Sequence, residues 1–377
     1  MKLNSFIFLV IFERKFFMSI GDIITYIMLF FAIIGAADRA IGCKFGPGKS
    51  FERGFEATGA LILAMVGPIF LAPLISKYLA PVLTPACEAI GIDPSIIAGL
   101  FLANDSGGWP LALALAQDEL VGKFSGSIVG SVMGCCIMFA FPMSFALAPK
   151  EKRPLVAKGL TIGLITIPIS CFVGGLCFGI GLVKLLLNLL PLIVFSGIFI
   201  IGLLFFEKIT IKIVTWMGYI ITAILTVALA AAMIIKVMKF EVSDVGTFDE
   251  SMLIIGGIAI FLCGAFTLLF FLQKFFGKAL GKLGAKLGMD ETSIIGMLTT
   301  MVNAIPMFGM TKDMNDRGVV VNIAFLVPAS FMIGDHLAFQ AAVDSSASMP
   351  LIVGKLAGGI VAVIIAMILT KPKKENA

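Results

Sequence analysis

The chain has 377 residues, of which 59% are hydrophobic and 14% are charged, and its mean hydropathy is +1.09. This composition excludes an ordinary water-soluble domain and indicates an integral membrane protein. The net charge of +5 at pH 7 is small and lies mostly in short loops, so it predicts membrane topology and no nucleic-acid partner.

Apolar runs long enough to cross about 30 Å of hydrocarbon recur along the chain. We therefore expect an all-α polytopic membrane protein with about nine full transmembrane helices. These are predicted near residues 20–42, 57–79, 124–148, 155–180, 185–206, 212–236, 252–273, 318–340 and 351–370. Two further apolar stretches, 94–116 and 291–311, are each interrupted in the middle by polar and helix-breaking residues.

The distribution of lysine and arginine predicts which loops face the cytoplasm. Basic residues gather before the second span, around residue 150, near residues 208 and 280, and in the C-terminal tail. The segment 241–250 is instead acidic and is expected to face outward. This pattern predicts an N-terminus outside and a C-terminus in the cytoplasm.

The same topology constrains the two interrupted stretches. Both ends of 94–116 are predicted to lie outside, and both ends of 291–311 in the cytoplasm, so neither stretch can cross the membrane. We expect two re-entrant broken hairpins that enter from opposite faces. Irregular backbone at membrane depth is tolerated only where protein or a water-filled cavity surrounds it, so these hairpins indicate a binding site.

A repeated phrase relates the two hairpins. Ile90-Gly91-Ile92-Asp93 precedes the first, and Leu287-Gly288-Met289-Asp290 precedes the second. We predict an inverted repeat, because paired interrupted segments in two halves of a membrane protein are typical of transporters. Chance similarity between apolar sequences is the alternative, and the agreement of the repeat with the loop charges weighs against it.

The repeat also divides the chain. The first membrane repeat is predicted at 18–183, a linking helix at 184–211, and the second repeat with a short basic tail at 212–377. Residues 1–17 form an N-terminal extension that is too short to span a membrane. It is expected either to precede the real start at Met18 or to lie on the membrane surface.

Polar residues at membrane depth are the candidates for substrate contact, because each is costly there. In the first hairpin these are Asn104, Asp105, Ser106 and Trp109. A carboxylate beside an indole can hold a small organic cation by charge pairing and cation–π attraction, and the amide and the hydroxyl could bind a substrate hydroxyl. The alternative is that these residues only cap the two halves of the hairpin.

Glycine and proline are predicted to break both hairpins. Gly107 and Gly108 permit a sharp turn in the first, and Pro110 suits the start of its returning half. Pro306 takes this place in the second hairpin, where Asn303 is a candidate for neutral hydrogen bonding to the substrate or for stabilising the helix break.

A third polar group is the pair Asp335 and His336, which contains the only histidine of the chain. Because imidazole titrates near neutral pH, the pair is a candidate proton relay or second substrate ligand. The alternative is an interfacial pair near the outer membrane surface.

Signatures of other classes are missing from the sequence. It contains no HExxH, GxSxG or phosphate-binding GxxxxGK[ST] pattern, and the seven cysteines lack metal-ligand spacing. We therefore expect no enzyme, no metal and no cofactor.

The run Phe101-Leu102-Ala103-Asn104-Asp105-Ser106-Gly107-Gly108-Trp109-Pro110 resembles the ethanolamine-utilisation permease family (EutH). The stretches 303–307 and 334–339 are similar to that family too. The resemblance implies a multi-pass protein of the bacterial cytoplasmic membrane that takes up ethanolamine, a small cation with a hydroxyl group. The candidate residues suit this substrate but would not separate it from choline or another small amine.

Together these features predict alternating access between two inverted repeats in the lipid bilayer. A passive channel or facilitator is one alternative, and a membrane-embedded enzyme with Asp335 and His336 as its acid–base pair is another. The sequence leaves open the coupling ion and whether the protein forms a homo-oligomer.

Overall fold

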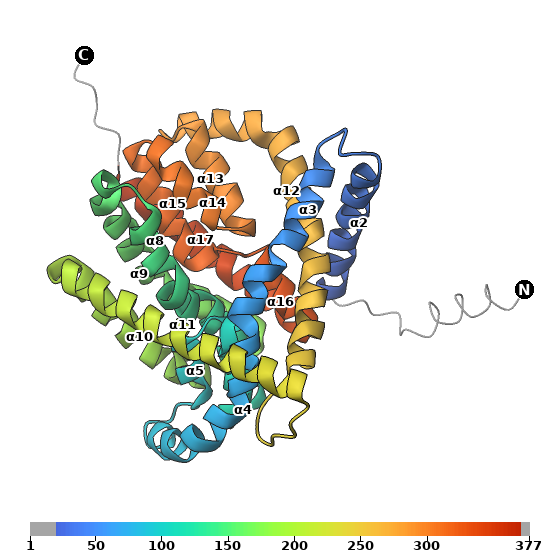
Figure 1. Ribbon diagram of the computed structural model, residues 1–377. Helices are drawn as coiled ribbons and strands as arrows, with labels where there is room; N and C mark the ends of the chain where they lie inside the picture. The colour runs from blue at the N-terminus through green and yellow to red at the C-terminus, as the bar shows by residue number, and fades with distance from the viewer. Residues whose placement is uncertain (1–19, 371–377) are drawn as a thin grey trace, which may run out of the picture.

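The structure is a computed structural model that describes residues 20–370, with side chains placed for all of these except residues 20, 277–283 and 285. This part of the chain is entirely helical and contains no strand (Figure 1). The predicted N-terminal extension 1–17 and the tail beyond residue 370 lie outside it.

The helices follow one another with short connections. In chain order they are α2 (Ile20–Ala40), α3 (Pro47–Glu56), α4 (Thr58–Glu88), α5 (Ser95–Phe101), α6 (Trp109–Leu115), α7 (Glu119–Phe124), α8 (Phe141–Leu147), α9 (Arg153–Cys177), α10 (Leu182–Phe205), α11 (Glu207–Met238), α12 (Phe248–Lys286), α13 (Glu291–Val302), α14 (Ile305–Met310), α15 (Asp316–Ala329), α16 (Asp335–Val343) and α17 (Ser348–Leu369). Wider π-helical turns, η1 (Asn104–Gly108), η2 (Ser125–Gly134) and η3 (Cys136–Ala140), connect some of them.

Among residues 20–370, eight helical segments are long and apolar enough to cross a membrane. They are Gly21–Ala40, Pro47–Glu88, Glu119–Leu147, Lys150–Cys177, Leu182–Phe205, Glu207–Met238, Phe248–Phe276 and Ser345–Leu369. Each overlaps one of the predicted spans, which confirms the all-α polytopic character of the chain.

The predicted continuous span at 318–340 is wrong, because α15 ends at Ala329 and α16 begins only at Asp335. In between, Phe331 has a positive φ of 56°, which an α-helix cannot accommodate. The N–H groups of Phe331 and Ile333 donate to the carbonyls of Thr300 and Met301, at 2.9 and 2.8 Å. The backbone of this segment therefore bonds to the end of α13 in place of its own helix.

A side-chain clasp closes the base of the first interrupted stretch. One carboxylate oxygen of Asp93 accepts from the N–H of Ser95 at 2.9 Å. The other accepts from the N–H groups of Gln117 and Asp118, at 3.0 and 2.9 Å. The two ends of 94–116 are thus held together, and α5 and α6 pack against each other as the arms of a hairpin.

The second interrupted stretch is closed in a matching way. Asp290 accepts from the N–H of Ser293 at 2.8 Å and from the N–H of Asn315 across the base. Gly91 and Gly288, each two residues before its aspartate, share a positive φ of 72°. The repeated phrase of the sequence therefore builds the same turn and the same clasp twice.

The first hairpin lies inside the protein. Its tip packs against η2, where Gly126, Gly130 and Gly134 line one side at intervals of four residues. A Cβ atom on Gly134 would lie 2.1 Å from the carbonyl oxygen of Leu102, so only glycine permits this approach. Small residues at this spacing let backbones pack closely in membranes, and here they enclose the irregular backbone in protein.

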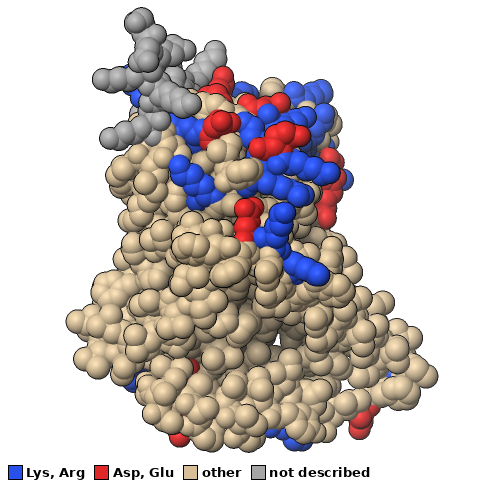
Figure 2. All heavy atoms as spheres, turned by 90° about the vertical axis from the view of Figure 1, so that its left-hand side faces the viewer, with Lys and Arg blue, Asp and Glu red and all other residues tan. Residues whose placement is uncertain are grey.

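One face of the molecule has a charged end and an uncharged body. On the face that Figure 2 shows, lysine, arginine, aspartate and glutamate gather at one end, and most of the rest of that face is uncharged. The acidic connection between α11 and α12 lies at the opposite end of the molecule from α13 (Figure 1). Helices α10 and α11 expose large apolar side chains along their length, which is the surface that lipid requires.

Candidate functional site

A cavity of about 380 Å³ lies where the irregular segments of the fold meet. Its size falls in the range of roughly 300–1,000 Å³ that is typical of small-molecule sites. The walls come from α4, the tip of the first hairpin, the η2–η3 region, α11, the start of α14 and the break before α16. The lining residues are Ala60, Leu61, Leu63, Ala64, Ala103, Asp105, Ser106, Cys135, Met138, Phe139, Thr222, Leu225, Ile305, Phe331, Asp335 and His336.

Four of the residues singled out from the sequence meet in this cavity. Asp105 and Ser106 come from the tip of the first hairpin, and Asp335 and His336 from the first turn of α16, some 230 positions later. The hydroxyl of Ser106 donates to the carboxylate of Asp105 at 3.2 Å. Two carboxyl groups therefore line one small cavity.

Asn104 lies next to Asp105 in the tip of the first hairpin but does not itself line the cavity. It is fully buried, and its side-chain amide donates to the backbone carbonyl of His336 at 3.3 Å. This bond ties the tip of the first hairpin to α16. The side-chain oxygen of Asn104 has no partner, and the same holds for one oxygen of Asp335 and for Nδ1 of His336. Buried polar atoms are nearly always hydrogen-bonded, and two of these three, on Asp335 and His336, belong to residues that line the cavity.

Two other candidates do not line the cavity. Trp109 is buried at the start of α6 and packs against Gly126 of η2. Asn303 accepts a hydrogen bond from the N–H of Ile305 at 2.9 Å and so caps α14. Its neighbour Ile305 reaches the cavity instead.

The predicted breaks are where the backbone turns. Gly107 has a φ of 99° and lies against Pro68 of α4, where a Cβ atom would come within 2.5 Å of the proline ring. Gly108 follows it, and its N–H bonds to the carbonyl of Ala103 at 2.8 Å. Pro110 and Pro306 occupy the first turns of α6 and α14, where proline costs no hydrogen bond.

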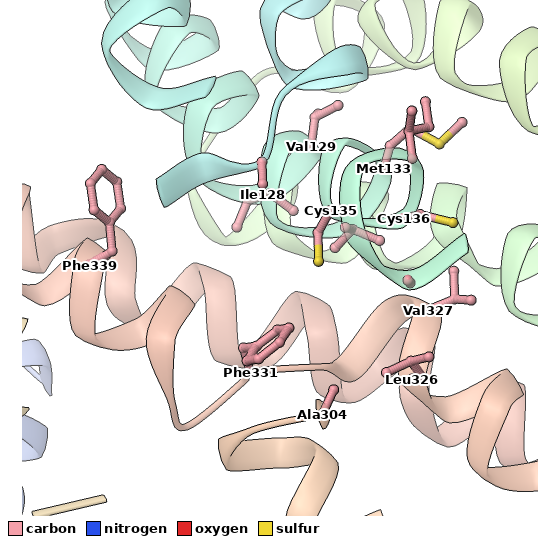
Figure 3. Close-up of a cluster of buried hydrophobic side chains, with 14 of the residues drawn as sticks. Ile128, Val129, Met133, Cys135, Cys136, Ala304, Leu326, Val327, Phe331 and Phe339 are labelled. Atoms are coloured by element: carbon pink, nitrogen blue, oxygen red, sulfur yellow. The ribbon is translucent and has the colours of Figure 1, made fainter. Parts of the chain in front are cut away.

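The aromatic wall of the cavity comes from residues that the sequence did not single out. Phe139 and Phe331 meet edge to face with ring centroids 5.2 Å apart, and Phe331 also contacts the imidazole of His336 at 4.9 Å. Phe331 lies between the helix that carries Cys135 and the second hairpin, which carries Ala304 (Figure 3). The chain has 34 phenylalanines, so no sequence signal marks these two.

Sequence reasoning also missed Lys355, the one charged residue of α17. Its side chain is 0% exposed. Its ammonium donates to the carbonyls of Ser131 in η2 and Ser330 at the end of α15, at 2.7 and 3.0 Å. A lone lysine inside an otherwise apolar span was the available signal.

The site resembles a ligand-binding chamber more than a metal centre. Within the described residues, no group of three or more histidine, cysteine, aspartate or glutamate side chains could hold a metal ion. What the cavity offers is two carboxyl groups, aromatic faces and hydroxyl groups in an otherwise apolar setting. These are the groups that recognise a small organic cation.

Comparison with known proteins agrees with this chemistry. Residues 20–369 match the model of the family described as "Ethanolamine utilisation protein, EutH". A protein of Listeria monocytogenes named "Probable ethanolamine permease EutH" is 43% identical over 93% of this chain and 94% of its own length. An Escherichia coli protein of the same name is 37% identical, over 95% and 97%.

A third relative, the "Uncharacterized protein YxeR" of Bacillus subtilis, is 37% identical over 94% of this chain and 96% of its own. No solved structure matches the chain. The similarity to these two relatives covers nearly all of each protein. The chain belongs to the ethanolamine utilisation protein EutH family.

Proposed function

We propose that this protein carries ethanolamine across the cell membrane into the cytoplasm through the cavity between the first hairpin and α16. The observation that carries the proposal is the convergence of Asp105 and Asp335 on one cavity with an aromatic wall. At neutral pH ethanolamine is mostly an ammonium ion with a hydroxyl two carbons away. The names of two relatives suggest this substrate, and the groups that line the cavity match its chemistry.

The ammonium group of the substrate would lie between the two carboxylates and against the rings of Phe139 and Phe331. Charge pairing and cation–π attraction both strengthen where water is excluded. The hydroxyl group would bond to Ser106, which lines the cavity. Trp109 and Asn303 would act indirectly, by packing the hairpin and capping α14.

Movement of the substrate would follow from alternating access. The two clasped hairpins would enter the membrane from opposite faces, in two inverted repeats with the N-terminus outside and the C-terminus in the cytoplasm. Rocking of one repeat against the other would expose the cavity to each side in turn. The contact between Asn104 and His336 crosses from one repeat to the other and would have to change during this motion.

The test is uptake of labelled ethanolamine by purified protein in liposomes, with choline and propanolamine as competitors. We expect saturable uptake that unlabelled ethanolamine blocks best, and exchange between labelled and unlabelled substrate across the membrane. Asp105→Asn and Asp335→Asn should each abolish it. The matched control is Asp249→Asn, because Asp249 is an exposed acid that pairs with Lys236 and does not line the cavity.

Two results would contradict the proposal. Normal uptake by a well-folded Asp105→Asn protein would remove this carboxylate as the partner of the ammonium group. Flux that rises linearly with concentration and shows no exchange would identify a passive channel in place of a carrier.

A further inference from the structure

Lys355 is a buried cation without an acidic partner. Its side chain is fully buried in α17, and none of the ion pairs among the described residues includes it. Burying an ammonium group away from water is costly unless other groups replace its hydration. A residue that only filled space here would be apolar, so the charge of Lys355 calls for an explanation.

Two backbone carbonyls replace the lost water. The ammonium donates to Ser131 O at 2.7 Å and to Ser330 O at 3.0 Å. Ser131 lies in the π-helical turns of η2, and Ser330 is the residue at which α15 stops and the backbone becomes extended. Both carbonyls therefore belong to irregular backbone, one in each half of the chain.

Transporters use backbone carbonyl groups of this kind to bind ions. In discontinuous membrane helices, unwound carbonyls and the C-terminal ends of half-helices coordinate Na⁺. Here the ammonium of Lys355 lies at such a place and joins the two halves of the fold.

We propose that Lys355 is a built-in cation that takes the place of a coupling Na⁺ ion, so that transport by this protein proceeds without Na⁺. The inference rests on the proposed function. In it Lys355 is a positioning residue: it holds the two irregular segments together and does not touch the substrate, since it is absent from the lining of the cavity.

The first test uses the wild-type protein in liposomes, with Na⁺ replaced by K⁺ on both sides of the membrane. We expect the initial rate of ethanolamine uptake to change by less than about twofold, because no Na⁺ site remains to be filled. Uptake that falls about tenfold or more without Na⁺ would overturn the inference while leaving the proposed function intact. No uptake in either medium would overturn both.

The second test compares two variants. Lys355→Ala removes the ammonium and leaves space beside the two carbonyls, whereas Lys355→Met removes the charge and keeps the volume. In K⁺ medium both should transport at less than about a tenth of the wild-type rate, since the carbonyls lose their partner. Na⁺ should raise the rate of Lys355→Ala at least about threefold and leave Lys355→Met unchanged, because the methionine fills the space.

This comparison separates the proposed role from a merely structural one. A loss of transport in Lys355→Ala that is the same in both media, in protein that remains monodisperse, would show that Lys355 only supports the fold, and would overturn the inference. Wild-type rates for either variant in K⁺ medium would do so as well.

Discussion

The clasp at the base of the first hairpin offers a measurable test of the fold. The side chain of Asp93 is 7% exposed and accepts from three backbone N–H groups, those of Ser95, Gln117 and Asp118. Replacing Asp93 with alanine leaves all three without an acceptor. The N–H of Ser95 is deeply buried, whereas Gln117 and Asp118 are at least partly exposed and can turn to water.

The magnitude follows from this difference. A buried donor left without a partner costs about 1–3 kcal/mol, and each hydrogen bond exchanged for water about 0.5–1.5 kcal/mol. The sum for Asp93→Ala is roughly 2–6 kcal/mol of unfolding free energy. For a chain of this size we expect a fall in melting temperature of roughly 3–8 °C.

The assay is thermal unfolding in detergent, followed by loss of the monodisperse peak in size-exclusion chromatography. Asp290→Ala should also lower the melting temperature, because Asp290 performs the same task in the second hairpin. The control is Asp249→Ala, which breaks an exposed ion pair worth less than about 1 kcal/mol. If Asp93→Ala unfolded at the same temperature as the control, the stability of the protein would not depend on this clasp, and the reasoning would fail.

Three further predictions concern packing, substrate binding and pH. Gly134→Ala should cost about 1–3 kcal/mol of stability, because its Cβ would overlap the carbonyl of Leu102, whereas Gly256→Ala, with open space around it, should not destabilise; melting temperatures compare the two. Phe331→Leu should raise the KM for ethanolamine about two- to thirtyfold through lost cation–π attraction, and an unchanged KM in the uptake assay would exclude this ring as a ligand. The hydrogen bond from Lys184 lowers the pKa of Asp118, so the stabilisation is present above the unfolded-state pKa and is lost as the pH falls through the lower folded-state pKa. Melting temperatures of Lys184→Met should therefore fall less steeply with acid than those of wild type, and identical acid profiles would contradict this.

Local signals made the two hairpins predictable. The repeated Gly-x-Asp phrase marks the turn and the clasp in each half, and the loop charges indicated that neither stretch crosses the membrane. Asp105, Ser106, Asp335 and His336 could be selected because polar groups are costly at membrane depth. Topology and the inverted relation of the repeats stay predictions.

Long-range contacts explain what the sequence did not reveal. The break after Ala329 depends on hydrogen bonds to Thr300 and Met301, which lie some thirty residues earlier. The burial of Trp109 against Gly126 depends on how the hairpin packs on η2. The aromatic wall likewise forms only when distant segments meet, so composition could not separate Phe139 and Phe331 from the other phenylalanines.

The hydrogen bonds that hold the break after α15 have a mechanical consequence. Because the N–H groups of Phe331 and Ile333 are bonded to the last turn of α13, we expect the second hairpin and the start of α16 to move together. A displacement of this hairpin would then also displace Asp335 and His336, which line the cavity. Such a movement would reposition a carboxyl group in the cavity without any melting of the helices between them.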